Sequence, residues 1–152
     1  MVFFDTSIVI AYYLPERYSG LVEAQYSANP QPTISSYVEL EVMSVLSRLI
    51  RTNELKLEDA RASADMFAAH LRHGYYTRIT LHEEHYRLAR DYIARFDLPL
   101  KAPDALHLAA AATERLPLVT ADRQLARNAA ALGIGVELLE PSAGPLAAAA
   151  TG

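Results

Sequence analysis

The chain has 152 residues, of which 51% are hydrophobic and 21% are charged, and its formal net charge is −4. This composition is typical of a compact globular domain that is large enough to build a core without cross-links. The absence of cysteine excludes disulfides, thiol nucleophiles and thiolate metal sites. We find no apolar run that could span a membrane and no signal-peptide pattern, so we expect a cytoplasmic protein with no membrane partner. Because the net charge is negative, nucleic-acid binding would need a local basic patch or bridging metal ions.

The first half of the chain predicts two short strands separated by helices. Residues 2–4 form an apolar run with aromatic and β-branched character, which is typical of a buried strand. The clearest helical pattern starts at Ser36, where apolar side chains recur with the spacing of one helix face. These side chains are Val42, Val45, Leu46, Leu49 and Ile50. We therefore expect strands at 2–4 and 33–34, and helices at 6–14, 18–28 and 36–52.

The second half continues the alternation of helices and strands. One helix carries an apolar face that stops at Gly74: Ala60, Ala64, Phe67, Ala68 and Leu71. The next shows the same spacing at His85, Leu88, Ala89, Tyr92, Ile93 and Phe96. We further expect strands at 75–81, 118–120 and 136–139, a helix that starts at Asp104, and a last helix around 125–132. The small-residue tail at 141–152 is expected to be disordered, which leaves one domain at residues 1–140.

This order of short strands and helices, without hairpin turn signals, predicts βαβ units. Such units build a three-layer α/β/α domain with a short, mainly parallel central sheet covered on both faces. Ligands of open α/β sheets bind beyond the carboxyl ends of the strands. Asp5 directly follows the first strand, and Asp122 comes two residues after the strand that ends at Thr120. Both aspartates are therefore expected at the edge where ligands bind.

Three aspartates, Asp5, Asp104 and Asp122, stand at predicted helix starts. Taken singly, each is explained as a helix N-cap, for which aspartate is a favoured residue. Taken together, carboxylates at one edge of a sheet repel one another unless cations neutralise them. Hard oxygen ligands of this kind suit Mg²⁺ or Mn²⁺, which can clamp a phosphodiester and activate a water. The set of three predicts a metal site.

The helix that starts at Ser36 offers two candidates for a fourth acidic ligand. Glu39 completes a Ser36-x-x-Glu39 capping-box pattern, so it has a structural role available. Glu41 has no such role and lies at the edge of the buried face, so we prefer Glu41 and keep Glu39 as the alternative. Thr120 either orients a carboxylate or a water through its hydroxyl or is an ordinary strand-end threonine.

Two other polar residues near the acids are better explained by structural roles. Ser7 follows Asp5 closely and could reach the site, but we prefer a role in capping the first helix. His107 lies three residues after Asp104 on the same helical face, where a packed core histidine is preferred over a supporting role at the site. We assign catalysis to neither.

Four segments occur in an order that resembles a known family. "DTS", "ISSYVELEVMSVLSRL", "DALHLAAA" and "LVTADRQLA" together resemble the motifs of PIN-domain ribonucleases, and more narrowly those of VapC-type toxins of type II toxin–antitoxin pairs. The resemblance runs from Val2 to about residue 140. One departure is Leu125, where many members carry an aromatic residue. The family's acids map to Asp5, Glu41, Asp104 and Asp122, with Thr120 as a hydroxyl companion of the last.

The resemblance implies Mg²⁺- or Mn²⁺-dependent endonucleolytic cleavage of RNA at these four acids. It also implies a homodimer, and inhibition by a small antitoxin whose C-terminal segment lies in the active-site groove. Four basic residues near the acids are candidates to bind the RNA backbone, although solvated helix faces explain most of them equally well: Arg17, Arg48, Lys101 and Arg123. Two other interpretations stay open, namely a non-catalytic protein- or RNA-binding module, and a metal-dependent phosphatase or DNA nuclease.

Overall fold

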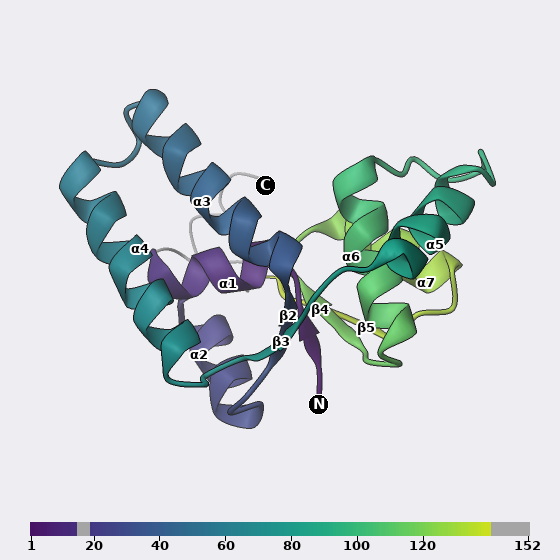
Figure 1. The fold of residues 1–152 in the computed structure, drawn as a ribbon, viewed down its shortest axis with the longest axis horizontal. Coiled ribbons are helices and arrows are strands. Elements are labelled where there is room, and N and C mark those ends of the chain that lie inside the picture. Colours follow the sequence, from purple (N-terminus) through teal and green to yellow (C-terminus); the bar gives the residue numbers. More distant parts are fainter. Residues whose placement is uncertain (15–18, 141–152) are drawn as a thin grey trace, which may run out of the picture.

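The computed structural model describes residues 1–14 and 19–140, in which strands and helices alternate as predicted (Figure 1). The strands are β1 (Phe3–Phe4), β2 (Thr33–Ser35), β3 (Thr77–Ile79), β4 (Leu118–Thr120) and β5 (Val136–Leu138). The helices are α1 (Thr6–Tyr13), α2 (Ser19–Ala28), α3 (Ser36–Arg51), α4 (Leu57–Arg72), α5 (Glu83–Ile93), α6 (Ala102–Thr113) and α7 (Arg123–Ala131). None of the helices in these two ranges is long and apolar enough to cross a membrane. Arg17 and the tail at 141–152, for which we predicted disorder, lie outside the described residues.

The five strands form one parallel sheet in the order β3-β2-β1-β4-β5. The chain steps from β1 through β2 to β3 in one direction, then returns to β4 on the other side of β1 and continues to β5. Because crossovers between parallel strands are right-handed, the two directions place their helices on opposite faces of the sheet. Figure 1 shows α1 to α4 on one side and α5 to α7 on the other. The predicted three-layer α/β/α fold is confirmed.

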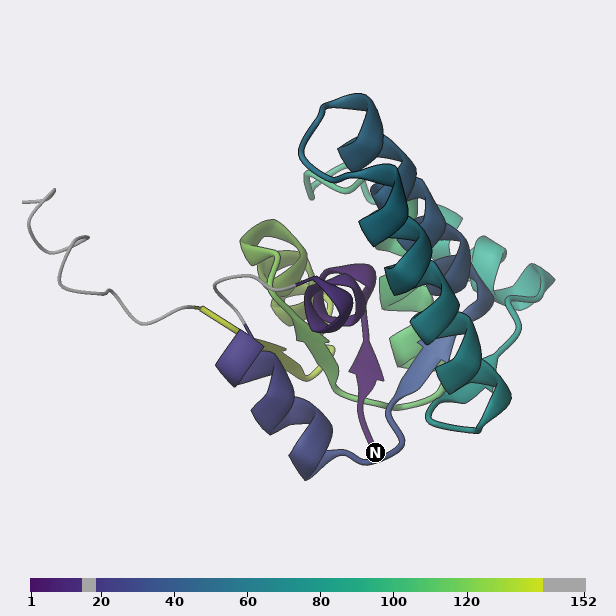
Figure 2. The ribbon, with the colours of Figure 1, turned by 90° about the vertical axis from the view of Figure 1, so that its left-hand side faces the viewer.

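The core lies on both faces of the short strands. Phe3, Phe4 and Leu118 have no exposed surface, and Leu108 of α6 is equally buried. Full burial of a side chain of this size stabilises a fold by about 1.5–3 kcal/mol. Figure 2 shows α1 seen end-on between α2 and the α3–α4 pair, which it contacts on either side. The core therefore holds β1 and the start of α1 rigidly in the middle of the domain.

The start of α6 differs from the prediction. The helix begins at Ala102 with Lys101 as N-cap, so Asp104 lies inside the first turn rather than at the cap. Pro103 is tolerated there because the first-turn amides have no partner within the helix. Our interpretation of Asp104 as an N-cap is therefore wrong.

Two other element boundaries also differ. We predicted Phe96 on the apolar face of α5, but the helix ends at Ile93, and Phe96 has a φ of +56° and is 87% exposed. Its left-handed backbone leaves the helical path. The strand predicted over 75–81 is limited to β3, because the Leu81 N–H bonds to the Ser36 hydroxyl instead of to a neighbouring strand.

Three tyrosine hydroxyls connect separate elements inside the core. The Tyr76 hydroxyl, just before β3, lies 2.7 Å from that of Tyr13 on α1 and 2.8 Å from that of Tyr26 on α2. The Tyr13 hydroxyl also lies 2.8 Å from Nδ1 of His70 on α4. Burial raises the pKa of all three tyrosines, so they stay protonated and the hydrogen bonds persist. Burial, together with the charge of His73, lowers the pKa of His70.

Protonation of His70 should destabilise the fold. Because its native pKa lies below the ordinary value of 6.5, the unfolded chain binds the proton more tightly, and stability is lost as the pH falls below 6.5. We expect the free energy of unfolding, measured by urea denaturation at pH 7.5 and 5.5, to fall more in the wild type than in His70→Gln. Equal losses in the two proteins would contradict this assignment.

Candidate metal centre at the carboxyl edge of the sheet

The strand order reverses between β1 and β4, and in open α/β sheets ligands bind at such a reversal, beyond the carboxyl ends of the strands. Phe3 pairs with Leu118 and Phe4 with Val119, so the residues that follow β1 and β4 emerge side by side. Each strand runs almost directly into a helix, α1 after Asp5 and α7 after Asp122. The sequence pattern of buried strand, aspartate and helix therefore occurs twice at one place.

Asp5 is a buried carboxylate, 3% exposed, with hydrogen bonds to both oxygens. Oδ1 accepts from the Ser7 hydroxyl at 2.6 Å and from the Ile8 N–H at 3.2 Å, which caps α1. Oδ2 accepts from the Thr120 hydroxyl at 2.6 Å. Burial raises the pKa of Asp5, and the charge of His107 and these three hydrogen bonds offset only part of that rise. The protein therefore orients this carboxylate completely before any ligand arrives.

The hydroxyls of Ser7 and Thr120 also hold the backbone that carries Asp122. Ser7 Oγ accepts from the Ala121 N–H at 2.9 Å, and Thr120 Oγ1 accepts from the Asp122 N–H at 3.0 Å. Each hydroxyl thus donates to Asp5 and accepts from an amide. We preferred a capping role for Ser7 over contact with the site, and this preference is wrong: Asp5 is the N-cap of α1, and the Ser7 hydroxyl in the first turn links α1 to the end of β4. The signal available in the sequence was the buried Asp5, which requires donors from its surroundings.

Asp122 is exposed and caps α7, the structural role that we gave as the alternative for each aspartate. Its Oδ1 accepts from the Leu125 N–H at 3.0 Å. Oδ2 makes no hydrogen bond within residues 1–14 and 19–140. One oxygen of this carboxylate is therefore available to a ligand.

Glu41 on α3 is held by two donors from other elements. Its Oε1 accepts from the Thr6 hydroxyl at 2.6 Å and lies 2.6 Å from Nε2 of His107 on α6. Because an ionised carboxylate only accepts, we assign the proton to Nε2. Burial acts to raise the pKa of Glu41, but the hydrogen bonds from His107 and Thr6 and the charge of His107 outweigh it, and the pKa is lowered.

His107 combines the core position that we predicted with a contact that we did not assign. It is 4% exposed and packs near Phe3 and Tyr37, at ring-centroid distances of 6.4 Å and 5.7 Å. Its Nδ1 is buried without a partner in the described part of the chain. The imidazole therefore serves Glu41 through Nε2 alone. The sequence spacing placed His107 near Asp104 but carried no signal for Glu41, which lies 66 residues away.

Glu39, the alternative to Glu41, is engaged elsewhere. Its carboxylate accepts two hydrogen bonds from Arg78 of β3, at 2.6 Å and 3.2 Å. The capping-box prediction for Ser36 and Glu39 is wrong, because the N-cap is Ser35, whose hydroxyl accepts from the Val38 N–H at 3.2 Å. Ser35 also ends β2, so strand and helix meet one residue earlier than the sequence pattern indicated.

Asp104 is half-buried and interacts electrostatically with the other three acids. Burial raises its pKa, and the charges of Asp122, Asp5 and Glu41 raise it further, whereas only His107 lowers it. No lysine or arginine is among the groups that shift this pKa. Within the described ranges the carboxylate of Asp104 accepts no hydrogen bond from the protein. Negative charge therefore gathers here, and His107 is the one positive group among the described residues that offsets part of it.

These residues fit Mg²⁺ or Mn²⁺ in donor type and in charge. In the present arrangement, however, no three histidine or acidic side chains of the described residues lie close enough together to hold an ion. Asp5 has both oxygens occupied by protein donors, while Asp104 and one oxygen of Asp122 carry none. An ion would therefore be held first by Asp104 and Asp122, after some movement of these side chains.

Comparison of the sequence with known protein families identifies the family to which the chain is similar. The sequence matches the PIN domain family over residues 2–131. No curated protein shows significant similarity to the chain.

Solved structures with a similar fold include several toxin–antitoxin proteins. A toxin–antitoxin complex from Klebsiella pneumoniae has a TM-score of 0.63 at 23% identity and covers 93% of this chain and 98% of its own. VapC20 from Mycobacterium tuberculosis, a sarcin-ricin loop cleaving toxin, has a TM-score of 0.66 at 18% identity, with coverages of 88% and 96%. VapBC2 from Rickettsia felis, bound to a DNA fragment from its promoter, has a TM-score of 0.64 at 20% identity, with coverages of 92% and 100%. At these identities the likeness is one of fold.

Thr120→Val should destabilise the protein by about 1–3 kcal/mol, because the buried Asp5 loses a donor and the Asp122 N–H loses its acceptor while the side-chain shape is kept. Thr33 on β2 offers a matched control, since its hydroxyl is buried without a partner among the described residues. We expect Thr33→Val to be neutral or stabilising in the same urea denaturation experiment. Similar losses in both variants would show that the Thr120 hydroxyl does not hold Asp5.

Proposed function

Because the chain belongs to the PIN domain family, we propose that its acidic centre is the active site of a Mg²⁺- or Mn²⁺-dependent endoribonuclease. The observation that carries the proposal is the gathering of negative charge around Asp104, to which Asp5, Glu41 and Asp122 contribute and which His107 offsets only in part. It lies where the strand order reverses, the position at which open α/β sheets bind ligands. An RNA phosphate is itself an anion, so the centre needs cations before it can accept this substrate.

The chain divides the work at this centre between orienting groups and carboxylates. Ser7 and Thr120 fix Asp5, while Thr6 and His107 fix Glu41, so these two carboxylates keep one orientation. Asp104 and Asp122 have free oxygens and would complete the ion's ligand set. When bound, a divalent ion neutralises charge on the phosphate and lowers the pKa of a coordinated water.

The reaction that we propose is hydrolysis of a phosphodiester bond of RNA. A water oxygen forms a new bond to phosphorus as the bond to the leaving ribose oxygen breaks, and that oxygen takes up a proton. The lowered pKa of Glu41 keeps this carboxylate ionised at neutral pH, so it can accept a hydrogen bond from a water or stabilise a cation. Thr6 and His107, which supply the donors that lower this pKa, act as positioning residues.

We further propose that the protein is the toxin of a toxin–antitoxin pair, with a small antitoxin as its partner and a homodimer as its assembly. Support comes from the proteins of similar fold, which include toxin–antitoxin complexes from two bacteria and a toxin that cleaves the sarcin-ricin loop. The same comparison supports RNA as the substrate, because one of the proteins of similar fold is a sarcin-ricin loop cleaving toxin.

Asp104→Asn should abolish cleavage of single-stranded RNA in Mg²⁺ or Mn²⁺, because it removes the carboxylate whose pKa is raised by the charges of the other three acids and which we propose as an ion ligand. The fold should be kept or slightly stabilised, since a repulsive charge is lost. Cleavage is measured by gel electrophoresis of labelled RNA, with single-stranded DNA and EDTA as parallel conditions.

The matched control is Asp65→Asn, which changes an exposed aspartate on α4 and should leave cleavage unchanged. Full activity in Asp104→Asn, or wild-type activity that persists in EDTA, would overturn the proposal. Preferential cleavage of DNA would replace RNA with DNA as the substrate.

A further inference from the structure

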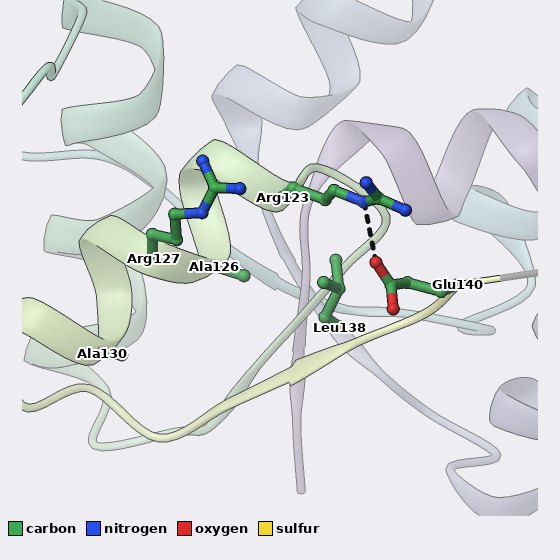
Figure 3. A pocket seen from close by; sticks show the side chains of 6 residues that line it. All are labelled: Arg123, Ala126, Arg127, Ala130, Leu138 and Glu140. Atoms are coloured by element: carbon green, nitrogen blue, oxygen red, sulfur yellow. Dashed lines mark ion pairs between the residues drawn. The ribbon is translucent and has the colours of Figure 1, made fainter.

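A pocket of about 440 Å³ lies between α7 and the end of β5 (Figure 3). It is lined by Arg123, Ala126, Arg127, Ala130, Leu138 and Glu140. None of these residues belongs to the acidic centre. Their charges are two positive and one negative, in a chain whose net charge is −4.

The two arginines form one local group. Arg123 and Arg127 are four residues apart on α7, so they project from the same face with about 6 Å between them along the helix axis. Ala126 and Ala130 stand beside them and leave space, because their side chains project little. Figure 3 shows both guanidinium groups reaching out from α7, that of Arg123 toward Glu140.

Glu140 forms an ion pair with one of the two guanidinium groups. Arg123 Nε lies 2.7 Å from Glu140 Oε1, and the two side chains are 69% and 50% exposed. Arg127 has no ion-pair partner in the part of the chain that the structure describes. An exposed ion pair is held weakly. A stronger anion can therefore compete with Glu140 for Arg123, and Arg127 on the same helix face is available to it.

The pocket lies next to the acidic centre. Asp122 immediately precedes Arg123 and caps the same helix. Thr120 and Leu138 are paired at the ends of β4 and β5, so the end of the pocket formed by Arg123 and Leu138 lies at the carboxyl edge of the sheet, next to Asp122. A nucleic-acid strand with one phosphate at the acidic centre would carry a neighbouring phosphate toward this pocket.

We infer that this pocket is a subsite for an RNA phosphate adjacent to the scissile one, bound by Arg123 and Arg127. Glu140 is the resident carboxylate that the phosphate displaces. A guanidinium group can donate two parallel hydrogen bonds to phosphate oxygens. Among the described residues, Glu140 contacts only Arg123 and leaves donors of both arginines without an acceptor. An acidic polypeptide has the same charge, but a phosphate is favoured because the pocket shares an edge with a centre suited to phosphodiesters. The inference rests on the proposed function.

The test measures binding without cleavage. A fluorescein-labelled 20-nucleotide single-stranded RNA of mixed sequence is titrated by anisotropy in EDTA at several salt concentrations. For Arg123→Gln/Arg127→Gln we expect weaker binding and a slope of log K against log salt that is shallower by about 0.7, the value for the one phosphate contact that the subsite loses. Glu140→Gln should bind RNA up to about fivefold more tightly, because the competing carboxylate is gone.

The matched control is Arg61→Gln/Arg72→Gln, which removes two exposed arginines from α4, on the far side of the domain. This variant should bind like the wild type. Equal weakening in the two double variants would overturn the subsite and reduce the effect to net charge. The subsite would also be overturned if Arg123→Gln/Arg127→Gln lost binding to poly-glutamate but bound RNA as the wild type does. Because binding is measured in EDTA, either result leaves the cleavage test of Asp104→Asn to decide the proposed function separately.

Discussion

The carboxylate of Asp5 is buried between β1 and β4, and a charge in that position requires compensation from the protein. The Thr120 hydroxyl, 115 residues away in the sequence, provides part of it at 2.6 Å. This hydrogen bond is possible only because the strand order reverses and brings β4 beside β1. It also fixes the turn that carries Asp122 through the Asp122 N–H. The sheet topology and the acidic centre therefore depend on one another.

The same constraint explains how the chain tolerates four acids at one edge. Asp5 and Glu41 accept hydrogen bonds from hydroxyl, amide and imidazole donors, whereas Asp104 accepts none from the described residues. The pKa of the buried Asp5 and of Asp104 is raised, and that of Glu41 is lowered. The two kinds of acid are thereby separated into oriented carboxylates and carboxylates with free oxygens. In our proposal a divalent ion supplies positive charge at the acids, and Arg123 and Arg127 of α7 bind a neighbouring phosphate of the RNA strand.

The sequence predicted the alternation of elements and the edge at which the acids lie, because buried strands, Pro and Gly boundaries and apolar helix faces are local signals. The bounds of β4 were predicted to the residue. The helix start before Asp104 was misplaced because Pro103 was taken as a boundary, whereas it lies within the first turn. The Ser36–Glu39 capping box failed because Ser35 caps the helix one residue earlier, and Glu39 instead pairs with Arg78, 39 residues away.

The contacts that hold the acids could not be predicted from the sequence. Ser7 looked like an ordinary cap residue beside Asp5, and nothing local indicates that Thr6 bonds to Glu41 or Ser7 to the Ala121 N–H. The contact between His107 and Glu41 likewise joins residues far apart in the sequence. These contacts cross between elements that meet only after the sheet has formed, so they depend on tertiary packing rather than on spacing.

The central claim is that the four acids form a divalent-ion site, and crystals soaked in MnCl₂ test it most directly. We predict an anomalous difference peak with the carboxylates of Asp104 and Asp122 as ligands, on the side of the sheet edge where Asp5 and Glu41 lie. Saturating Mn²⁺ without a peak at this edge, or a peak held by other residues, would contradict the account.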